Sequence, residues 1–429
     1  MAMGSSTRFL VAFAGFLALL TACGDTPLPV QDQGLDSPRT AAVSGTASPS
    51  TDRALDILGP DCPVQWVETG RVAAKEGSKL DLSAPVQAKI HTDTAGDADG
   101  WLPGGSHDHP GYSPVGAFGD GGLLLHDNQT RGEDNHYFSW HPGDAPQPVW
   151  AVAEDLQDIP AEGTGSNVVT VRHGFAAPFA VWRLIVHNDN AGGGCLLSQS
   201  DLSAYSREMM QLGFPGLAPT PSLEGDLIVW SERFLSPDGQ RHKRVVLYNL
   251  ASFEMRTLAE IDNVNDSDLW SASISGNTVS WLDQPPNGQP TVQVLRSLTE
   301  GTESRSVLSQ RPKMSALLDR GTYLALSLED RQVAVDLRDG SSVKVADFGA
   351  WIYSSGRYMS WAAATGRVGY YDAREKTVHL IDTKGAETVD AYVLGKYFIW
   401  QEFRNVPAPN RPSGETRRES RFYAVRLPD

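Results

Sequence analysis

The stretch PSLEGDLIVWSE, residues 221–232, contains a pattern that recurs along the chain. A glycine is followed by a short alternating apolar run, and a tryptophan stands five residues after the glycine. Four units keep both residues: Gly225 with Trp230, Gly276 with Trp281, Gly356 with Trp361, and Gly395 with Trp400. Between them Gly321 keeps its place, and Leu326 replaces the tryptophan. Successive glycines are 51, 45, 35 and 39 residues apart, which is the range of one propeller blade per repeat.

Each unit continues with further short strands. The tryptophan strand is followed by a second apolar segment, such as RVVLYNL at 244–250 or QVAVDL at 332–337, and then by a shorter one, such as MRTLAEI at 255–261. Short alternating segments separated by Gly, Asn, Asp and Pro are typical of an all-β domain. The glycine permits a tight turn, and the tryptophan is large enough to fill the space between neighbouring sheets. The repeat therefore predicts a β-propeller.

The number of blades follows from two weaker units upstream. GDGGLLLHDN around Gly122 and GTGSNVVTVRHG around Gly165 keep the glycine and the apolar strand but lack the tryptophan. Counting them predicts seven blades, with six or eight still open. Because the last unit stops one strand short, we expect an N-terminal strand to complete the final sheet and close the ring. VQWVE at 64–68 and PVQAKIH at 85–91 are the two candidates.

The repeat also resembles a known group. The pattern P-x-h-x-G-x-x-h-x-W-x-[DE], as in residues 221–232 and in ASISGNTVSWLD at 272–283, is similar to the TolB-like β-propeller repeats of exported bacterial and archaeal surface proteins. The similarity covers residues 215–429 well and 115–210 loosely. It departs from the TolB form in that SPDG occurs once, at 236–239, and out of register. The resemblance implies a propeller in an exported protein and implies no particular activity.

The N-terminus has the features of a targeting segment. FLVAFAGFLALL, residues 9–20, is apolar, too short to span a bilayer and as long as the core of a signal peptide. The sequence Leu20-Thr21-Ala22-Cys23 that overlaps its end resembles the lipobox of bacterial lipoproteins. We therefore predict a lipoprotein signal peptide over residues 1–22 and a lipid on Cys23, which places the mature chain outside the cytoplasm. An ordinary signal peptide and a buried apolar helix are the alternatives.

Two further parts follow. Residues 24–56 are rich in Pro, Ser, Thr, Gly and Asp without a hydrophobic period, so residues 23–56 are predicted to be a lipidated cysteine and a flexible tether. Residues 57–429 form the predicted propeller domain. With Cys23 lipidated, Cys62 and Cys195 remain as an even pair in an oxidising compartment, which favours a disulfide over two buried thiols.

The charge balance bears on the partners. The chain has 52 acidic and 36 basic residues, a formal net charge of −16. A field of this sign repels phosphate backbones, so nucleic acid is not an expected partner. We expect a monomer that contacts the membrane through its lipid and binds a protein or a polysaccharide.

Acidic residues recur two places after the tryptophan, at Glu232, Asp283 and Glu402. They could gather on one rim as a functional carboxylate cluster. A position that repeats in several blades is first a feature of the blade, however, and we expect a solvated strand end or a turn hydrogen bond.

A second candidate is the loop GGSHDHPGYSP, residues 104–114, because His107 and His109 could both bind one metal ion. No third and fourth ligand can be identified, which favours a solvated loop. The sequence requires no cofactor and contains no G-x-S-x-G elbow, phosphate-binding glycine loop or H-E-x-x-H helix.

Two functions are compatible with these features. The favoured one is a lipid-anchored surface propeller that binds or scaffolds a protein or an envelope component, without catalysis. The alternative is an extracytoplasmic hydrolase or lyase whose site lies at the propeller channel.

Overall fold

The structure, a computed structural model, describes most of the chain after residue 60. The described ranges are 61–70, 72–94, 112–118, 121–127, 135–141, 144–152, 156–164, 167–174, 181–188, 194–201, 221–235, 240–262, 268–348, 352–361, 367–383, 387–407 and 416–428. Residues 58–429 form one compact unit, to which all of the described residues belong.

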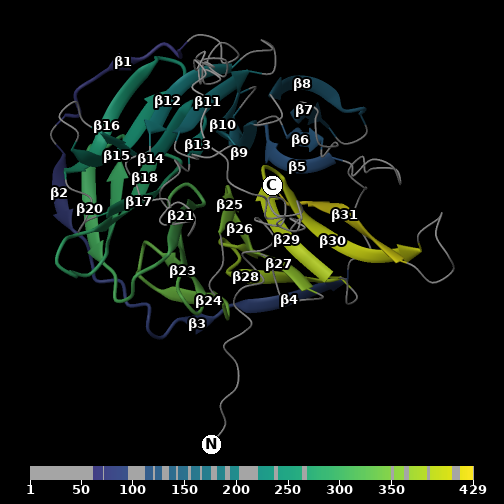
Figure 1. The fold of residues 1–429 in the computed structure, drawn as a ribbon. Coiled ribbons are helices and arrows are strands. Elements are labelled where there is room, and N and C mark those ends of the chain that lie inside the picture. The colour runs from purple at the N-terminus through teal and green to yellow at the C-terminus, as the bar shows by residue number, and fades with distance from the viewer. Residues whose placement is uncertain are drawn as a thin grey trace, which may run out of the picture. The chain divides into compact units, whose positions relative to one another are not determined.

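Within these ranges, strands β5 to β31 form seven antiparallel sheets, which we call blades 1 to 7 in chain order (Figure 1). Blade 1 holds β5 (Tyr112–Ala117), β6 (Leu123–Asp127), β7 (Asn135–Trp140) and β8 (Gln147–Val152). Blade 2 holds β9 (Leu156–Thr164), β10 (Asn167–Gly174), β11 (Val181–Asn188) and β12 (Gly194–Asp201). Blade 3 holds β13 (Ser222–Glu224), β14 (Leu227–Leu235), β15 (Arg241–Asn249) and β16 (Glu254–Asp262).

The remaining blades repeat this order. Blade 4 holds β17 (Asp268–Ser275), β18 (Thr278–Gln284), β19 (Val292–Ser297) and β20 (Thr302–Val307). Blade 5 holds β21 (Met314–Leu318), β22 (Tyr323–Ser327), β23 (Gln332–Asp336) and β24 (Ser342–Ala346). Blade 6 holds β25 (Tyr353–Ser355), β26 (Tyr358–Trp361), β27 (Arg367–Asp372) and β28 (Thr377–Asp382). Blade 7 holds β29 (Glu387–Leu394), β30 (Tyr397–Pro407) and β31 (Thr416–Arg426).

The predicted seven-bladed β-propeller is confirmed. In every blade the strands follow one another in chain order, and the first strands of neighbouring blades lie against each other, as β13 does against β17 and β25 against β29. The first strands therefore form the inner ring. The turn glycines have the backbone that was expected, because Gly225 has φ +57° and Gly395 has φ +55°, the left-handed region that favours glycine.

The segment 61–94, which we call the belt, runs along the outer edges of the blades (Figure 1). Its strands are β1 (Gln65–Trp66), β2 (Ala73–Glu76), β3 (Val86–Gln87) and β4 (Lys89–Thr94). They pair in parallel with β16, β20, β24 and β28, the outermost strands of blades 3 to 6. Asp61 adds a single bridge to Leu196 of blade 2. One extended segment thus ties five consecutive blades together.

The predicted mode of ring closure is therefore wrong. VQWVE lies against blade 3 and PVQAKIH against blades 5 and 6, while β29–β31 pair with no N-terminal strand in the described part of the chain. Blade 7 instead meets blade 1 by side-chain packing, in which Ile399 and Ala424 contact a cluster that includes Leu123, Leu125 and Trp140. The sequence identified segments able to form strands but contained no signal for the edge that each one joins.

Side chains of the belt also enter the body of the propeller. Leu80 and Leu82 are buried with Trp270 and Leu308 between blades 4 and 5. Burial of a leucine side chain is worth about 1.5–3 kcal/mol, which offsets the cost of ordering an extended segment. The belt comes so close to β20 at Gly77 that an added Cβ would lie 2.4 Å from Ser306 Oγ. No larger residue would fit there without moving the belt.

The repeated tryptophans are wedges between blades, as predicted. Trp230, Trp281 and Trp400 are 0%, 1% and 0% exposed. Trp230 packs with Leu184 of blade 2, and Trp281 packs with Val245 of blade 3, so each ring faces the preceding blade. In blade 5, where Leu326 replaces the tryptophan, Trp270 of blade 4 fills the same kind of space.

Candidate functional site

Three candidate site residues lie outside the described part of the chain: Cys23, His107 and His109. The lipid on Cys23 and a metal at the two histidines therefore stay predictions. The structure does place the two other cysteines. Cys62, at the start of the belt, and Cys195, on β12 of blade 2, form a disulfide with Cα atoms 4.8 Å apart. This covalent link fixes the beginning of the belt to the propeller.

The repeated acids are structural, and two of them are buried. The Glu232 carboxylate is 3% exposed and accepts hydrogen bonds from Trp230 Nε1 at 2.7 Å, from Arg244 Nε at 2.7 Å and from the Ser198 hydroxyl of blade 2. Glu402 likewise accepts a bond from Trp400 Nε1 at 3.0 Å. The expected solvated strand end is wrong for both. In both blades the glutamate instead accepts a hydrogen bond from the indole N–H of the tryptophan two residues before it.

The third repeated acid behaves differently. Asp283 accepts a hydrogen bond from Arg305 of the same blade, and the buried Nε1 of Trp281 has no partner among the described residues. Glu232, Asp283 and Glu402 therefore serve three separate local contacts, in blades 3, 4 and 7, and do not form one carboxylate cluster.

A buried lysine ties blade 3 to blade 4. The Lys243 side chain on β15 is fully buried, and its Nζ donates to Asp268 Oδ1 on β17 at 2.6 Å. Arg233 Nη2 lies 3.4 Å from the same oxygen. Burial lowers the pKa of Lys243 to about 8, although the charge of Asp268 acts in the opposite direction.

This lysine makes stability depend on pH. Its pKa in the unfolded chain is near 10.5, so between about pH 8 and pH 10.5 the unfolded state holds a proton that the folded state has released. The cost of burying the charge is fully present below pH 8 and is relieved as the pH rises through this window. The free energy of unfolding of the wild type should therefore rise relative to that of Lys243→Met from pH 7.5 to 10. Urea denaturation of both proteins would measure the difference, and a difference constant with pH would contradict the prediction.

A second buried charge lies between blades 5 and 6. Asp336, at the end of β23, accepts hydrogen bonds from Arg338 Nη2 at 2.6 Å and from Lys376 Nζ of blade 6 at 3.0 Å. The hydrogen bond from Arg338 and the one from Lys376 hold the pKa of Asp336 well below its usual range. Strongly perturbed groups can mark active sites, but Lys243 and Asp336 both join neighbouring blades.

One group of described residues has a donor set that a metal ion could use. His242, Glu260 and Asp262, on β15 and β16, have ligand atoms within 4.8 Å of one another. His242 Nδ1 lies 2.9 Å from Asp262 Oδ1 and 3.4 Å from Glu260 Oε1. One imidazole and two carboxylates suit a borderline divalent ion such as Zn²⁺. The same distances also fit a histidine that is ion-paired when protonated, with both carboxylates largely exposed.

A small cavity lies within the inner ring. Its volume is about 110 Å³, and its lining comes from the first strands of six blades and the turns that follow them. Serine hydroxyls and apolar side chains predominate in this lining, and Glu224 is the one carboxylate among the residues that line it. At this size the cavity could hold a few water molecules or a very small ligand.

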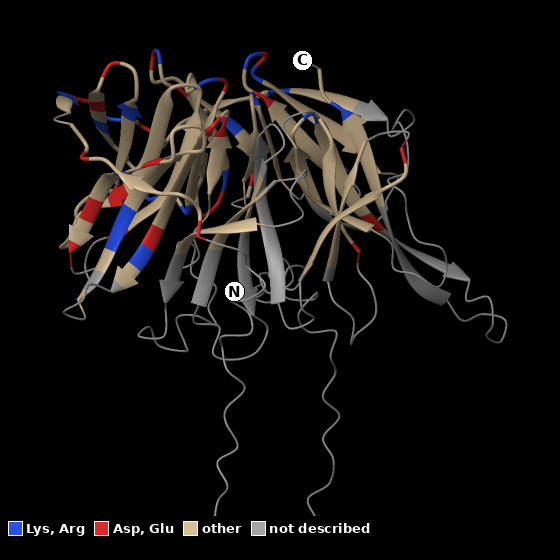
Figure 2. Ribbon diagram, turned by 90° about the horizontal axis from the view of Figure 1, so that it is seen from above, with Lys and Arg blue, Asp and Glu red and all other residues tan. Residues whose placement is uncertain are grey.

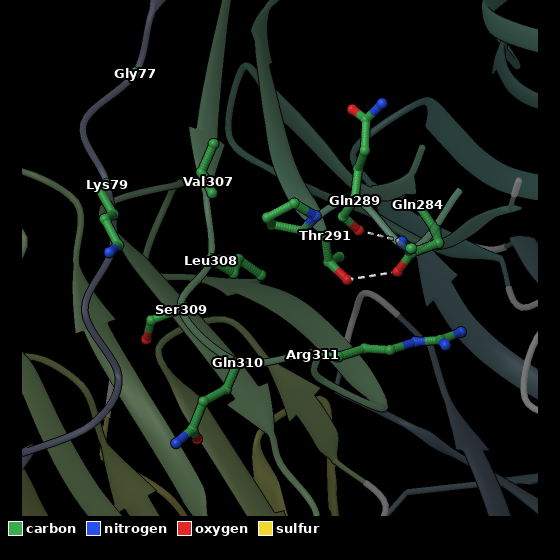
Figure 3. Close-up of a pocket in the computed structure, with 12 residues that line it drawn as sticks. Gly77, Lys79, Gln284, Gln289, Thr291, Val307, Leu308, Ser309, Gln310 and Arg311 are labelled. Atoms are coloured by element: carbon green, nitrogen blue, oxygen red, sulfur yellow. Dashed lines mark hydrogen bonds between the residues drawn. The ribbon is translucent and has the colours of Figure 1, made fainter. Parts of the chain in front are cut away.

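A larger groove of about 780 Å³ lies where the belt crosses the outer part of blade 4 (Figure 3). Three segments line it: the belt at Gly77 and Lys79, the connection from β18 to β19, and residues 307–311 at the end of β20 and beyond it. Gln284 is held in the wall, because it accepts a bond from Thr291 Oγ1 at 2.7 Å and donates one to the Gln289 carbonyl at 2.7 Å. The volume is in the range of small-molecule sites.

The sequence did not identify this groove. Its lining residues are separated by up to more than 200 positions along the chain. They meet only because the belt runs along the outer strand of blade 4. No motif marks them.

Comparison with known proteins adds no functional assignment. No protein-family model matches the chain, and no curated protein matches it. Among solved structures, the chain is similar to the crystal structure of the computationally designed Ika8 protein, with 11% sequence identity over 82% of this chain and 100% of that chain and a TM-score of 0.39. The assignment of the fold rests on strand pairing alone.

None of the elements described is a helix with the length and hydrophobicity needed to cross a membrane.

Proposed function

We propose that the protein is a non-catalytic propeller, held on the outer side of a membrane by a lipid on Cys23, that binds a component of the cell envelope. Residues 24–56 are then the tether, and the propeller is the binding part. The lipobox-like sequence before Cys23 and the resemblance to TolB-like repeats support the location.

The groove at the belt is the observation that supports binding most strongly. It has the volume of a ligand site, and its polar lining combines amides, hydroxyls and cations. Its lining holds no carboxylate, histidine or cysteine that could act as a general acid, a general base or a metal ligand. This composition suits recognition of a polar molecule better than its chemical conversion.

The location can be tested at the lipidation site. Cys23→Ala should abolish labelling by a radioactive fatty acid and move the processed protein from the membrane fraction to the soluble fraction. Cys62→Ala is the matched control, because it removes a cysteine that we assign to the disulfide, and its protein should stay in the membrane fraction. A processed Cys23→Ala protein that remained in the membrane fraction would refute the lipid anchor.

Binding can be tested by cosedimentation of the full chain with purified insoluble envelope polymers. We expect the protein to sediment with at least one polymer. The length of that polymer should stay unchanged over hours of incubation. Release of soluble fragments from the polymer would instead favour the alternative, a hydrolase or lyase. If the protein neither sediments with a polymer nor releases fragments from one, a role in binding these polymers is refuted.

A further inference from the structure

The groove at the belt contains two cations and no acid. Lys79 comes from the belt, and Arg311 comes from the link between blades 4 and 5. Figure 3 shows the two side chains on different sides of the groove, with Leu308 and Thr291 between them in this view. The described salt bridges do not include either cation.

The basic character of the groove is local. The chain as a whole carries a formal net charge of −16, and acidic and basic positions are interspersed along the described strands and turns (Figure 2). The lining holds two cations and no acid, so the groove attracts a negatively charged group. The net negative charge of the chain repels the same group elsewhere. Asp81 is an acid that competes for Lys79. Hydrogen bonds from Ser83 are the main cause that lowers the pKa of Asp81, its carboxylate also accepts a bond from Ser309 Oγ, and the charge of Lys79 contributes least.

Arg311 is held by a contact that a ligand would not have to provide. The guanidinium carbon of Arg311 lies 5.4 Å from the ring centroid of Trp270, within cation–π range. The indole is fixed in turn, because Trp270 Nε1 donates to the Lys313 carbonyl at 3.1 Å. Fixing an arginine in this way reduces the conformational entropy that binding would otherwise cost.

The backbone around Lys79 is fixed on both sides. Gly77 N donates to the Arg305 carbonyl at 3.0 Å, and Leu80 N donates to the Val307 carbonyl at 3.0 Å. Leu80 itself is 3% exposed. The lysine therefore projects from an anchored segment, although its own side chain is exposed.

The rest of the lining indicates the kind of molecule that carries the negative charge. Gln289 is exposed and offers a neutral amide that suits hydroxyl groups, and Val307, which is 39% exposed, offers an apolar contact for the C–H face of a sugar ring. A peptide would bind best by adding a strand to a free sheet edge. The free edge of this sheet is that of β2, its last strand, and no residue of β2 lines the groove.

From these contacts we infer that the groove binds an acidic oligosaccharide, with its carboxylates at Lys79 and Arg311. This inference rests on the proposed function and names the ligand class of the same protein. Because the two cations come from separate segments on different sides of the groove (Figure 3), a chain with several carboxylates offers one to each cation, whereas a single uronic acid carries only one carboxylate. The oligomer should therefore bind more tightly than the monomer.

The test uses ligands that differ in charge and share a backbone. Calorimetric titration of the full chain with β-1,4-linked triglucuronate is compared with cellotriose, which carries a CH₂OH group in place of each carboxylate. We expect triglucuronate to bind at least about tenfold more tightly, and its advantage to shrink as salt is added. Glucuronic acid serves as the monomer, and triglutamate, a peptide of similar charge, tests the competing class.

The variants separate the site from the overall charge. Lys79→Gln and Arg311→Gln should each weaken triglucuronate binding by about tenfold or more, because each removes one charge-assisted hydrogen bond. Lys75→Gln is the matched control: it removes a lysine from the same belt outside the groove, and it should bind as the wild type does. A melting curve of each variant shows that it is folded.

The outcomes are distinct. Equal binding of cellotriose and triglucuronate, tighter binding of triglutamate, unchanged binding by both groove variants, or no binding of triglucuronate would each overturn the inference. If the protein still sediments with an envelope polymer in any of these cases, the proposed function stands and only the ligand class is wrong.

Discussion

Glu232→Ala should lower the free energy of unfolding by about 3–5 kcal/mol, because it empties a buried carboxylate site that several donors share. Trp230 Nε1 would lose its 2.7 Å partner in a fully buried position. Arg244, whose side chain is 22% exposed, would lose its ion pair. Ser198 of blade 2 would lose its bond across the blade interface. This one carboxylate thus binds Ser198 of blade 2 and both Trp230 and Arg244 of blade 3.

The matched control for this variant is Asp347→Ala. Asp347 pairs with Lys344 at the surface, where its side chain is 79% exposed, and exposed ion pairs contribute about 0–1 kcal/mol. Chemical denaturation of both variants and the wild type would give the two differences. Equal effects of Glu232→Ala and Asp347→Ala would show that the buried carboxylate does not hold blades 2 and 3 together.

Trp281→Ala should destabilise the propeller by about 3–5 kcal/mol, the cost of removing a large aromatic ring from a packed core. The ring is 1% exposed and lies in the cluster that joins blades 3 and 4. Its Nε1 has no hydrogen-bond partner among the described residues, so the loss is one of packing, of burial and of the cation–π contact with Arg296, 5.3 Å from the ring centroid. The effect differs in kind from that of Glu232→Ala, which keeps the ring of Trp230 and removes its hydrogen-bond acceptor.

A tryptophan on the belt is the control for the wedge. Trp66 is 52% exposed and contacts Arg244 through its ring face. Trp66→Ala should therefore cost about 1 kcal/mol or less, the value of an exposed cation–π contact. If Trp281→Ala and Trp66→Ala gave the same denaturation midpoint, the repeated tryptophans would not be wedges.

The parts of the fold that repeat could be predicted from the sequence. Gly225 and Trp230 recur at blade spacing because every blade needs a tight turn and a wedge, and this requirement is local enough to leave a pattern. The pattern also showed correctly that the acid after the tryptophan belongs to the blade. It could not show that Glu232 is buried, because burial depends on Ser198 and Arg244, which lie elsewhere in the chain.

The belt and the groove could not be predicted for a different reason. β2 has the sequence AAKE, with all four residues exposed, so its place is set by backbone hydrogen bonds to β20 and not by an apolar face. An edge strand of this kind has no hydrophobic period to detect. Nothing in the sequence around Lys79 or Arg311 distinguishes them from other surface cations. They line the same groove only because the belt runs along blade 4.

The disulfide at the first residues of the belt also determines how the propeller responds to mechanical force. Tension applied to the chain before Cys62 passes through the sulfur atoms directly into β12 and is carried by blade 2. The strands β1 to β4 lie beyond that point, so the load has a path into blade 2 that does not run along them. After reduction, the same pull would act on the bond from Cys62 N to the Leu196 carbonyl, then on the bond from the Tyr248 hydroxyl to the Pro63 carbonyl and then on β1, peeling the belt from one blade after another. The cross-link thus offers tension a route into blade 2 that bypasses the belt, one wall of the groove proposed to recognise a ligand.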